Sequence, residues 1–458
     1  MVQKSASRSQ ANLFYGSLIN MLDANDPLIA LADAIEWSVI IGKLEKYYDQ
    51  TNGRPGKPIR LMAGLLMLKQ LENLSDENVV LQWKRNPYYQ YFCGMNDYHS
   101  SLPCDATELV KFRQRIGEEG INVIFGASVA LHSEAAEEER VIIDTTAHEK
   151  NVTYPTDGKL AIKIINTLHK IAKREGIALR RTYVKEIKGH RITLRFFRHP
   201  KKKKKAIVAM RRLRTIAKVL IRDLDRHFDD RQHERYSEDF YLFMRILLQK
   251  RTSSNKIYSL HESHIYTMAK GKDHKSYEYG TKASIVSTYT HGIIVGVCAH
   301  AINQHDSKTL KAALAHAHTN RKVTINEAVC DRGYRGTKQI GTTQISIPGV
   351  RLKKDTEEQK EAKRKKFRRR AAIEPVIGHL KHDHRMARNY LKGFIGDQIN
   401  LLMAACSWNL KKWMNNFIHA LFLQMDYRIV AALILCYFTK WNIPVKISID
   451  ATSIHSIK

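Results

Sequence analysis

The chain is short of acidic residues for its basic content. Its 458 residues include 76 Lys and Arg but only 45 Asp and Glu, which gives a net charge of +31 and a pI near 9.8. An excess of this size favours a polyanionic partner, and nucleic acid is the commonest one. A basic protein that is merely soluble is the alternative, but the charges cluster rather than spread evenly.

Cysteine is also scarce and has no pattern. The chain contains Cys93, Cys104, Cys298, Cys330, Cys406 and Cys436, which form no CxxC pair and no even framework. This usage argues against a structural zinc site and favours a reducing compartment.

A long apolar run free of charge is missing. Residues 417–438 are long enough to span a bilayer, but Asp426 and Arg428 stand at the centre of the run. Charges are costly at that depth. We therefore expect a buried or loosely ordered C-terminal tail and no membrane partner.

The first part of the chain is predicted to be helical. Residues 57–71 carry leucines near helical spacing, and Asp105 with Glu108 forms a capping-box pattern before another helix. Arg60 and Lys84 lie close to these helices. They are compatible with a helix-turn-helix-like DNA reader or with a plain helical bundle, and both interpretations stay open.

The pattern changes abruptly after residue 138. Residues 141–143 are a short β-branched run, which predicts a buried strand that ends at Asp144. Residues 159–232 return to a helical pattern, with roughly two dozen Lys and Arg against about six acids, and Lys201–Lys205 stand in the middle. We interpret this segment as an inserted subdomain that faces phosphates; a solvated loop is the alternative for the lysine run.

Strand patterns are frequent in the second half. Asp306 or Ser307 is expected to cap a helix there. The order of elements predicts a mixed sheet with helices on its faces. Strands are predicted at 276–290, 292–302, 324–334 and 342–350, and helical stretches at 306–319 and 357–390.

Two aspartates end predicted strands. Asp144 closes the first strand and Asp331 closes the fourth, and the ends of neighbouring strands lie roughly 5 Å apart. Two carboxylates this close repel each other unless cations hold them. A third carboxylate from a facing helix would complete a site for Mg²⁺ or Mn²⁺, which prefer oxygen ligands.

Glu374 is the natural third carboxylate. Phe367, Arg370, Glu374 and Lys381 share one face of a helix, and Pro375 predicts that this helix kinks or restarts beside Glu374. The alternative is that Glu374 only pairs with a basic neighbour in the same helix. His382 and His384 flank Asp383 too closely to converge on one metal, so we expect both rings at the surface or facing DNA.

These segments together resemble a known family. "IIDTTAHEK", "CDRGYRG" and "FRRRAAIEPVIGHLK" are similar to the three acidic motifs of the DDE transposases, specifically the insertion-sequence-five family of bacteria. Phe367 stands where that family usually has a tyrosine, whereas Arg370, Glu374 and Lys381 match. "HKSYEYGTKASIV" and "SSLPCDATELVKFRQRIG" also resemble the family. The likeness covers roughly residues 15–415, and residues 418–458 have no recognised counterpart.

The resemblance implies a mixed α/β fold. It implies an RNase H-like catalytic core with a helical N-terminal domain and a basic helical insertion. The expected parts are an N-terminal DNA-binding domain at 1–135, a core at 139–158 and 256–415, an insertion at 159–255, and a tail of unclear role at 416–458.

The resemblance also implies a function. The expected enzyme cleaves the ends of an insertion sequence and joins them to target DNA by two-metal-ion phosphoryl transfer, as a homodimer on DNA in the bacterial cytoplasm, associated with the nucleoid. Asp144, Asp331 and Glu374 would be catalytic residues and ligands of two Mg²⁺ or Mn²⁺ ions. The expected DNA contacts come from Arg370, Lys381, Tyr334, Arg335, Lys282 and Lys203. For Tyr334 and Arg335, a role in stabilising the turn is an equal alternative.

Two other functions stay open at this point. The chain could be a metal-dependent nuclease of the same fold that cuts without joining. It could also be a DNA-binding protein derived from a transposase that has lost activity. The intact acidic triad speaks against the second, whereas Phe367 and the unmatched tail keep it open.

Overall fold

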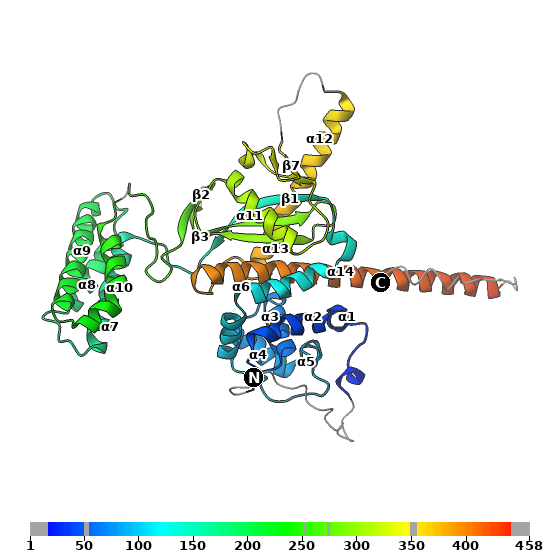
Figure 1. The fold of residues 1–458 in the computed structure, drawn as a ribbon, viewed down its shortest axis with the longest axis horizontal. Helices are drawn as coiled ribbons and strands as arrows, with labels where there is room; N and C mark the ends of the chain where they lie inside the picture. Colours follow the sequence, from blue (N-terminus) through cyan, green and yellow to red (C-terminus); the bar gives the residue numbers. More distant parts are fainter. Residues whose placement is uncertain (1–16, 50–54, 251, 273–274, 349–354, 441–458) are drawn as a thin grey trace.

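The computed structural model describes residues 17–49, 55–250, 252–272, 275–348 and 355–440. Figure 1 shows three parts: a group of N-terminal helices, a sheet with helices on its faces, and a separate helical bundle. The predicted class, a mixed α/β fold, is confirmed.

The N-terminal part consists of helices. They are α1 (Pro27–Ala34), α2 (Trp37–Leu44), α3 (Ile59–Leu71), α4 (Asp76–Arg85), α5 (Pro87–Phe92) and α6 (Ala106–Ala130), with the short 3₁₀ helices η1 (Leu18–Met21), η2 (Glu45–Tyr47) and η3 (Ser133–Ala136). The predicted capping box is present, because Asp105 accepts from the first turn of α6 and Glu108 reaches back to the Asp105 N–H. Gly117, at φ 58°, kinks α6.

The sheet has the strand order β2-β3-β1-β5-β7-β6, with β4 paired to β3. β1 is antiparallel to β3 and parallel to β5, so the sheet is mixed as predicted. The strands are β1 (Arg140–Glu149), β2 (Tyr266–Lys272), β3 (Lys275–Thr288), β4 (Ile294–His300), β5 (Glu327–Val329), β6 (Gln339–Ile340) and β7 (Thr343–Ser346).

The first strand is longer than predicted. β1 does not end at Asp144 but continues to Glu149, because β3 pairs with it along its whole length, from Val141↔Thr288 to Glu149↔Gly280. The pairing with β5, in contrast, stops at Ile142↔Val329. Asp144 therefore lies where one neighbour of β1 ends while the other continues. The strands β2 and β6 were not among those that the sequence pattern predicts.

Helices flank the sheet and connect it to the N-terminal part. They are α11 (Asp306–Thr319), α12 (Glu357–Arg370), α13 (Ile373–His382) and α14 (Gly393–Lys440). α14 lies between the sheet and the N-terminal helices (Figure 1), and Leu401, Leu402 and Cys406 are fully buried on it. One hydrophobic core therefore runs from the N-terminal helices through α14 into the sheet.

The predicted C-terminal tail begins as part of a helix. Residues 416–440 continue α14, and the remainder of the predicted tail, 441–458, lies outside the described residues. Among the helices that the structure describes, none has the length and apolar character needed to cross a membrane.

The insertion is a helical bundle with its own core. It contains α7 (Asp157–Arg174), α8 (Val184–Leu194), α9 (Lys203–Asp225) and α10 (Asp230–Leu248), packed around residues such as Leu168, Leu213 and Phe243. The chain enters it after β1 and returns to the sheet at β2. Glu149 and Tyr266, near the two ends of the excursion, are both paired with Gly280 of β3.

A buried ionic cluster fixes the base of this excursion. Lys150 Nζ lies 2.5 Å from Asp397 Oδ1 and 3.3 Å from Glu262 Oε2. His264 Nε2 lies 2.9 Å from the other oxygen of Asp397. Burial favours the protonated form of Asp397, but His264 and Lys150 outweigh it and lower the pKa of this carboxyl. The segments on both sides of the insertion are thus bound to the same residue of α14.

Candidate active site

The two predicted aspartates lie at equivalent places on neighbouring strands. β1 and β5 run parallel, and their last pair is Ile142↔Val329. Asp144 and Asp331 each follow that pair by two residues. The two strands are neighbours as expected, but Asp144 stands inside β1 rather than at its end.

Local hydrogen bonds orient both carboxylates. Asp144 Oδ1 accepts from the Thr145 N–H at 2.7 Å. Asp331 caps the short 3₁₀ helix η4 (Arg332–Tyr334), and its Oδ1 accepts from the Gly333 N–H at 2.8 Å. Each aspartate therefore keeps a second oxygen that these bonds do not use.

Glu374 comes from the facing helix pair. α12 ends at Arg370 and α13 begins at Ile373, so the helix restarts beside Glu374 as Pro375 predicts. Arg370 Nη2 donates to Glu374 Oε1 at 3.0 Å, and its Nη1 lies 3.7 Å from Asp144 Oδ2. The ion pair with a basic neighbour that was the alternative for Glu374 does form, although it joins the end of α12 to the start of α13. The same guanidinium also reaches the first aspartate.

The carboxylates influence one another electrostatically. The pKa of Asp144 rises to about 6, chiefly because the side chain is buried, and the negative charges of Asp331 and Glu374 add to this rise. The Thr145 N–H and the Arg370 guanidinium oppose it only in part. Burial and the two other acidic side chains therefore all oppose the ionisation of Asp144.

The donor set suits a hard divalent cation in its chemistry. All three side chains offer carboxylate oxygens, which magnesium and manganese prefer, and their mutual repulsion would be relieved by a cation. Among the described residues, no three His, Cys, Asp or Glu side chains are already gathered closely enough to hold a metal. In this arrangement Arg370 supplies the positive charge between Asp144 and Glu374.

The residues expected to contact DNA have different surroundings. Tyr334 is fully buried, which favours its turn-stabilising alternative, whereas Arg335 is exposed. Lys381 is half-buried on α13. Lys282 Nζ is engaged within the fold, 2.8 Å from Asp306 Oδ1 and 2.6 Å from the Gln304 carbonyl oxygen.

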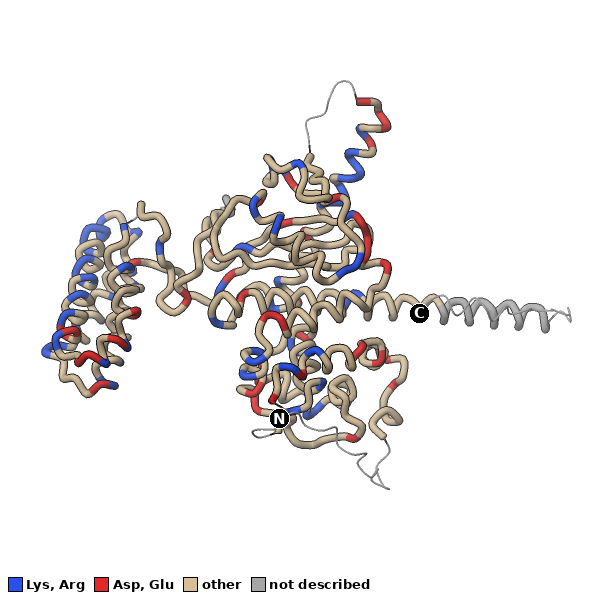
Figure 2. The backbone as a smooth tube through the Cα atoms, in the orientation of Figure 1, with Lys and Arg blue, Asp and Glu red and all other residues tan. Residues whose placement is uncertain are grey.

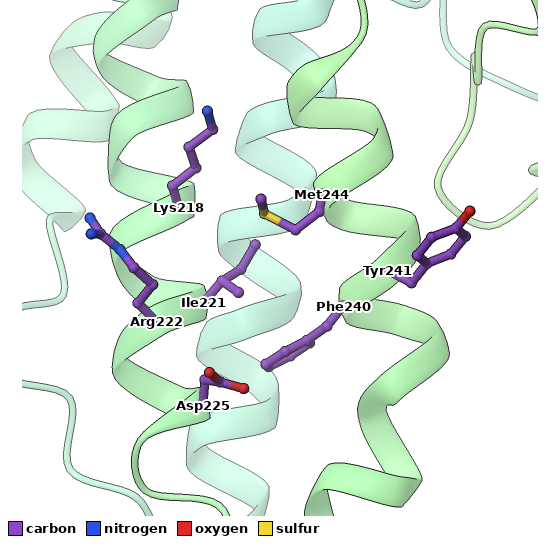
Figure 3. A pocket seen from close by; sticks show the side chains of 7 residues that line it. All are labelled: Lys218, Ile221, Arg222, Asp225, Phe240, Tyr241 and Met244. Carbon is purple, nitrogen blue, oxygen red and sulfur yellow. The ribbon is translucent and has the colours of Figure 1, made fainter.

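The basic residues of the insertion lie at its surface. Lys203 and the other members of Lys201–Lys205 are all exposed, and Figure 2 shows that Lys and Arg gather along α9 and α8. A cavity of about 610 Å³ lies between α9 and α10, and Figure 3 shows Lys218 and Arg222 of α9 on one side of it, with Phe240 and Tyr241 of α10 on the other. It belongs to the insertion and lies apart from the three carboxylates.

Two expectations were wrong in ways that matter for the site, and the first concerns Asp306. The cap of α11 is His305, not Asp306 or Ser307. Asp306 instead accepts from Thr145 Oγ1 at 3.0 Å and pairs with Lys282. Sequence reasoning missed this role because an aspartate at the start of a helix has the pattern of a cap.

The second concerns one of the two histidines near α13, which is not at the surface. His382 is exposed as expected, but His384 is buried. Its carbonyl oxygen accepts from Gln70 Nε2 at 2.7 Å. This bond joins α3 to the segment after α13, and it therefore connects the N-terminal helices to the region that carries Glu374.

Comparisons with known proteins cover the N-terminal helices and most of the chain after the insertion. Residues 16–115 match the family model described as "Transposase domain (DUF772)", and residues 249–410 match the one described as "Transposase DDE domain". The chain is 36% identical over 198 residues to "Uncharacterized protein ORF8 in nfe locus" of Rhizobium meliloti, an alignment that spans 42% of this chain and 95% of that protein. No solved structure matches.

Proposed function

Because this chain belongs to the DDE-type insertion-sequence transposases, we propose that it cleaves the ends of an insertion sequence and joins them to target DNA. The motif spacing supports the insertion-sequence-five family and an RNase H-like core. The observation that carries the proposal is the position of Arg370, whose guanidinium contacts both Asp144 and Glu374, together with the parallel register that sets Asp331 level with Asp144.

In this proposal the three carboxylates hold two Mg²⁺ or Mn²⁺ ions. Bound divalent cations would lower the pKa of a water molecule or of a DNA 3′-hydroxyl and stabilise the leaving oxygen of an in-line displacement at phosphorus. Asp144 would provide its oxygens from β1, Asp331 from the turn after β5, and Glu374 from an exposed position on α13. No protein nucleophile is needed, and no covalent enzyme intermediate is expected.

The basic residues around the site neutralise phosphates. Arg370 now pairs with two of the carboxylates, and we propose that it transfers to a DNA phosphate when cations occupy the site, since both are oxyanions that a guanidinium binds in the same way. Lys381 lies two turns beyond Glu374 on the same helix. It would contact the next phosphate on that side.

We propose that the insertion and the N-terminal helices bind the DNA away from the three carboxylates. The exposed Lys201–Lys205 of the insertion would attract the backbone regardless of sequence. In the N-terminal part, Lys84 and Arg85 are exposed at the end of α4, whereas Arg60 packs over the Trp37 ring at 4.8 Å. Joining two element ends requires that both be held together, so we propose a homodimer on DNA.

The test is a strand-transfer assay. Pre-cleaved end DNA and a supercoiled plasmid are incubated with the full chain and Mg²⁺ or Mn²⁺. Covalent joining that is lost in Glu374→Gln and retained in Glu358→Gln, an exposed glutamate of α12, supports the transposase. End cleavage without joined product under either metal would favour a nuclease, and DNA binding without cleavage would favour an inactive derivative.

A further inference from the structure

Asp306 is a fourth carboxylate beside the proposed cation site. It is the first residue of α11, and His305 performs the capping function there. Asp306 Oδ1 accepts from Thr145 Oγ1 at 3.0 Å and from Lys282 Nζ at 2.8 Å. The lysine balances its charge, so Asp306 is held in place without adding to the repulsion among the other acids.

Asp306 also lies against the turn that carries Asp331. A methyl group added to Gly333 would lie 3.0 Å from Asp306 Oδ2 and 3.0 Å from Asp331 Oδ1. Both distances are shorter than an ordinary van der Waals contact. Gly333 therefore fits between the two carboxylates because it has no side chain, and the turn packs directly on Asp306.

The contacts of Asp306 with Thr145 and with Gly333 both affect a carboxylate of the proposed site. Thr145, which Asp306 holds through its hydroxyl, donates its N–H to Asp144 Oδ1. Gly333, which packs against Asp306, donates its N–H to Asp331 Oδ1. Thus each of these two aspartates is oriented by a backbone N–H of a residue that Asp306 contacts.

We propose that Asp306, fixed by Lys282, is a positioning residue that sets the separation and orientation of Asp144 and Asp331 for cation binding. The inference rests on the proposed function, because it assigns Asp306 a purpose at that cation site. It also explains why Lys282 is engaged within the fold instead of being available to DNA. Partners that orient metal ligands in this way typically contribute about 10- to 100-fold to metal affinity.

The first test measures metal binding in the absence of DNA. The full chain and Asp306→Asn are titrated with Mn²⁺ by calorimetry, and their melting temperatures are recorded without metal. We expect Mn²⁺ affinity to fall about tenfold in Asp306→Asn. Asp157→Asn is the matched control, because Asp157 also stands in the first turn of a helix and pairs with an arginine, at 2.6 Å, but lies in the insertion.

The second test leaves every charge in place. Gly333→Ala should push the two carboxylates apart and weaken Mn²⁺ binding by a similar factor, whereas Gly189→Ala, at a helical glycine with open space around it, should have no effect. This variant decides the question if Asp306→Asn fails to fold.

The outcomes separate this inference from the function on which it rests. A wild-type chain that binds Mn²⁺, and loses binding in Asp144→Ala, confirms the cation site. Unchanged Mn²⁺ affinity in both Asp306→Asn and Gly333→Ala would then overturn the positioning role alone. A wild-type chain that binds no Mn²⁺ would overturn the metal-dependent function and this inference with it.

Discussion

An ion pair in the body of the molecule and one in the insertion differ in how deeply they are buried. In the body, Asp76 lies between Lys69 and Arg113 with N–O distances of 2.9 and 2.6 Å, and all three side chains are at most 15% exposed. In the insertion, Arg214 and Asp157 pair at 2.6 Å, but their side chains are 25% and 33% exposed.

The basic residues therefore serve two different purposes. Buried pairs and clusters in the body hold helices and strands in place. On the insertion, the lysines of the 201–205 run remain in solvent, where they attract a polyanion over a distance. A net charge alone does not distinguish these uses, but burial does.

The strongest contrast concerns catalysis. Asp144→Ala, Asp331→Ala and Glu374→Ala should each lower Mg²⁺-dependent cleavage of element-end DNA by more than about a hundredfold, because each removes a proposed metal ligand. DNA affinity should stay the same, since it comes mainly from Lys and Arg. Cleavage above roughly a tenth of the parent rate in any one variant would remove that residue from the site.

A second contrast concerns stability. Asp76→Asn should lower the free energy of unfolding by about 3 kcal/mol, because it leaves the buried Arg113 without its partner. Asp157→Asn in the insertion should cost less than about 1 kcal/mol. Urea unfolding followed by tryptophan fluorescence reports on the body, since no tryptophan lies in the insertion, and circular dichroism reports on both. An equal loss of unfolding free energy in Asp76→Asn and Asp157→Asn would contradict this prediction.

The effect at Asp76 should also depend on pH. Burial opposes ionisation of this carboxyl, but Arg113 and Lys69 outweigh it and lower its pKa from 3.8 to about 2. Because the folded pKa lies below the unfolded one, the stabilisation is fully present above about pH 4 and is lost as the pH falls through about 2. The difference between wild type and Asp76→Asn should shrink over that interval.

The smallest expected effect concerns the lysine run. Changing Lys201–Lys205 to glutamine should weaken DNA binding equally on all sequences. It should also flatten the salt dependence by about 0.9 in log–log slope for each phosphate that the lysines no longer neutralise. Lys84→Gln, in the N-terminal helices, is the comparison, because a sequence-dependent loss there would indicate a DNA-reading role. An unchanged slope in the first variant means that the run is a solvated loop.

The sequence predicts well what depends on local pattern. The apolar residues before Asp144 and Asp331 predict neighbouring strands, and Pro375 predicts the restart of the helix beside Glu374. The sequence pattern does not predict structure that depends on partners remote in the chain. Residues 145–149 lack a continuous apolar run, and they extend β1 because β3, more than a hundred residues later, pairs with them.

The same limit applies to single side chains. His384 is buried because it meets Gln70, which is 314 residues away in the chain. Asp306 has the local pattern of a helix cap, and only the fold shows that Thr145 and Lys282 surround it. The positions that sequence reasoning missed are therefore those whose environment comes from segments remote in the chain.

The pairing of Glu149 and Tyr266 with the same residue, Gly280, has a consequence for the history of the gene. The two ends of the excursion lie on either side of β3, two strand spacings or about 10 Å apart. Because β1 and β2 run parallel, a shorter crossover of about a dozen residues over β3 would be enough to connect them. A single recombination event could therefore remove, add or exchange this bundle as a cassette, leaving every other strand and helix unchanged. Relatives that share the core are free to carry different cassettes at this point, each suited to its own element.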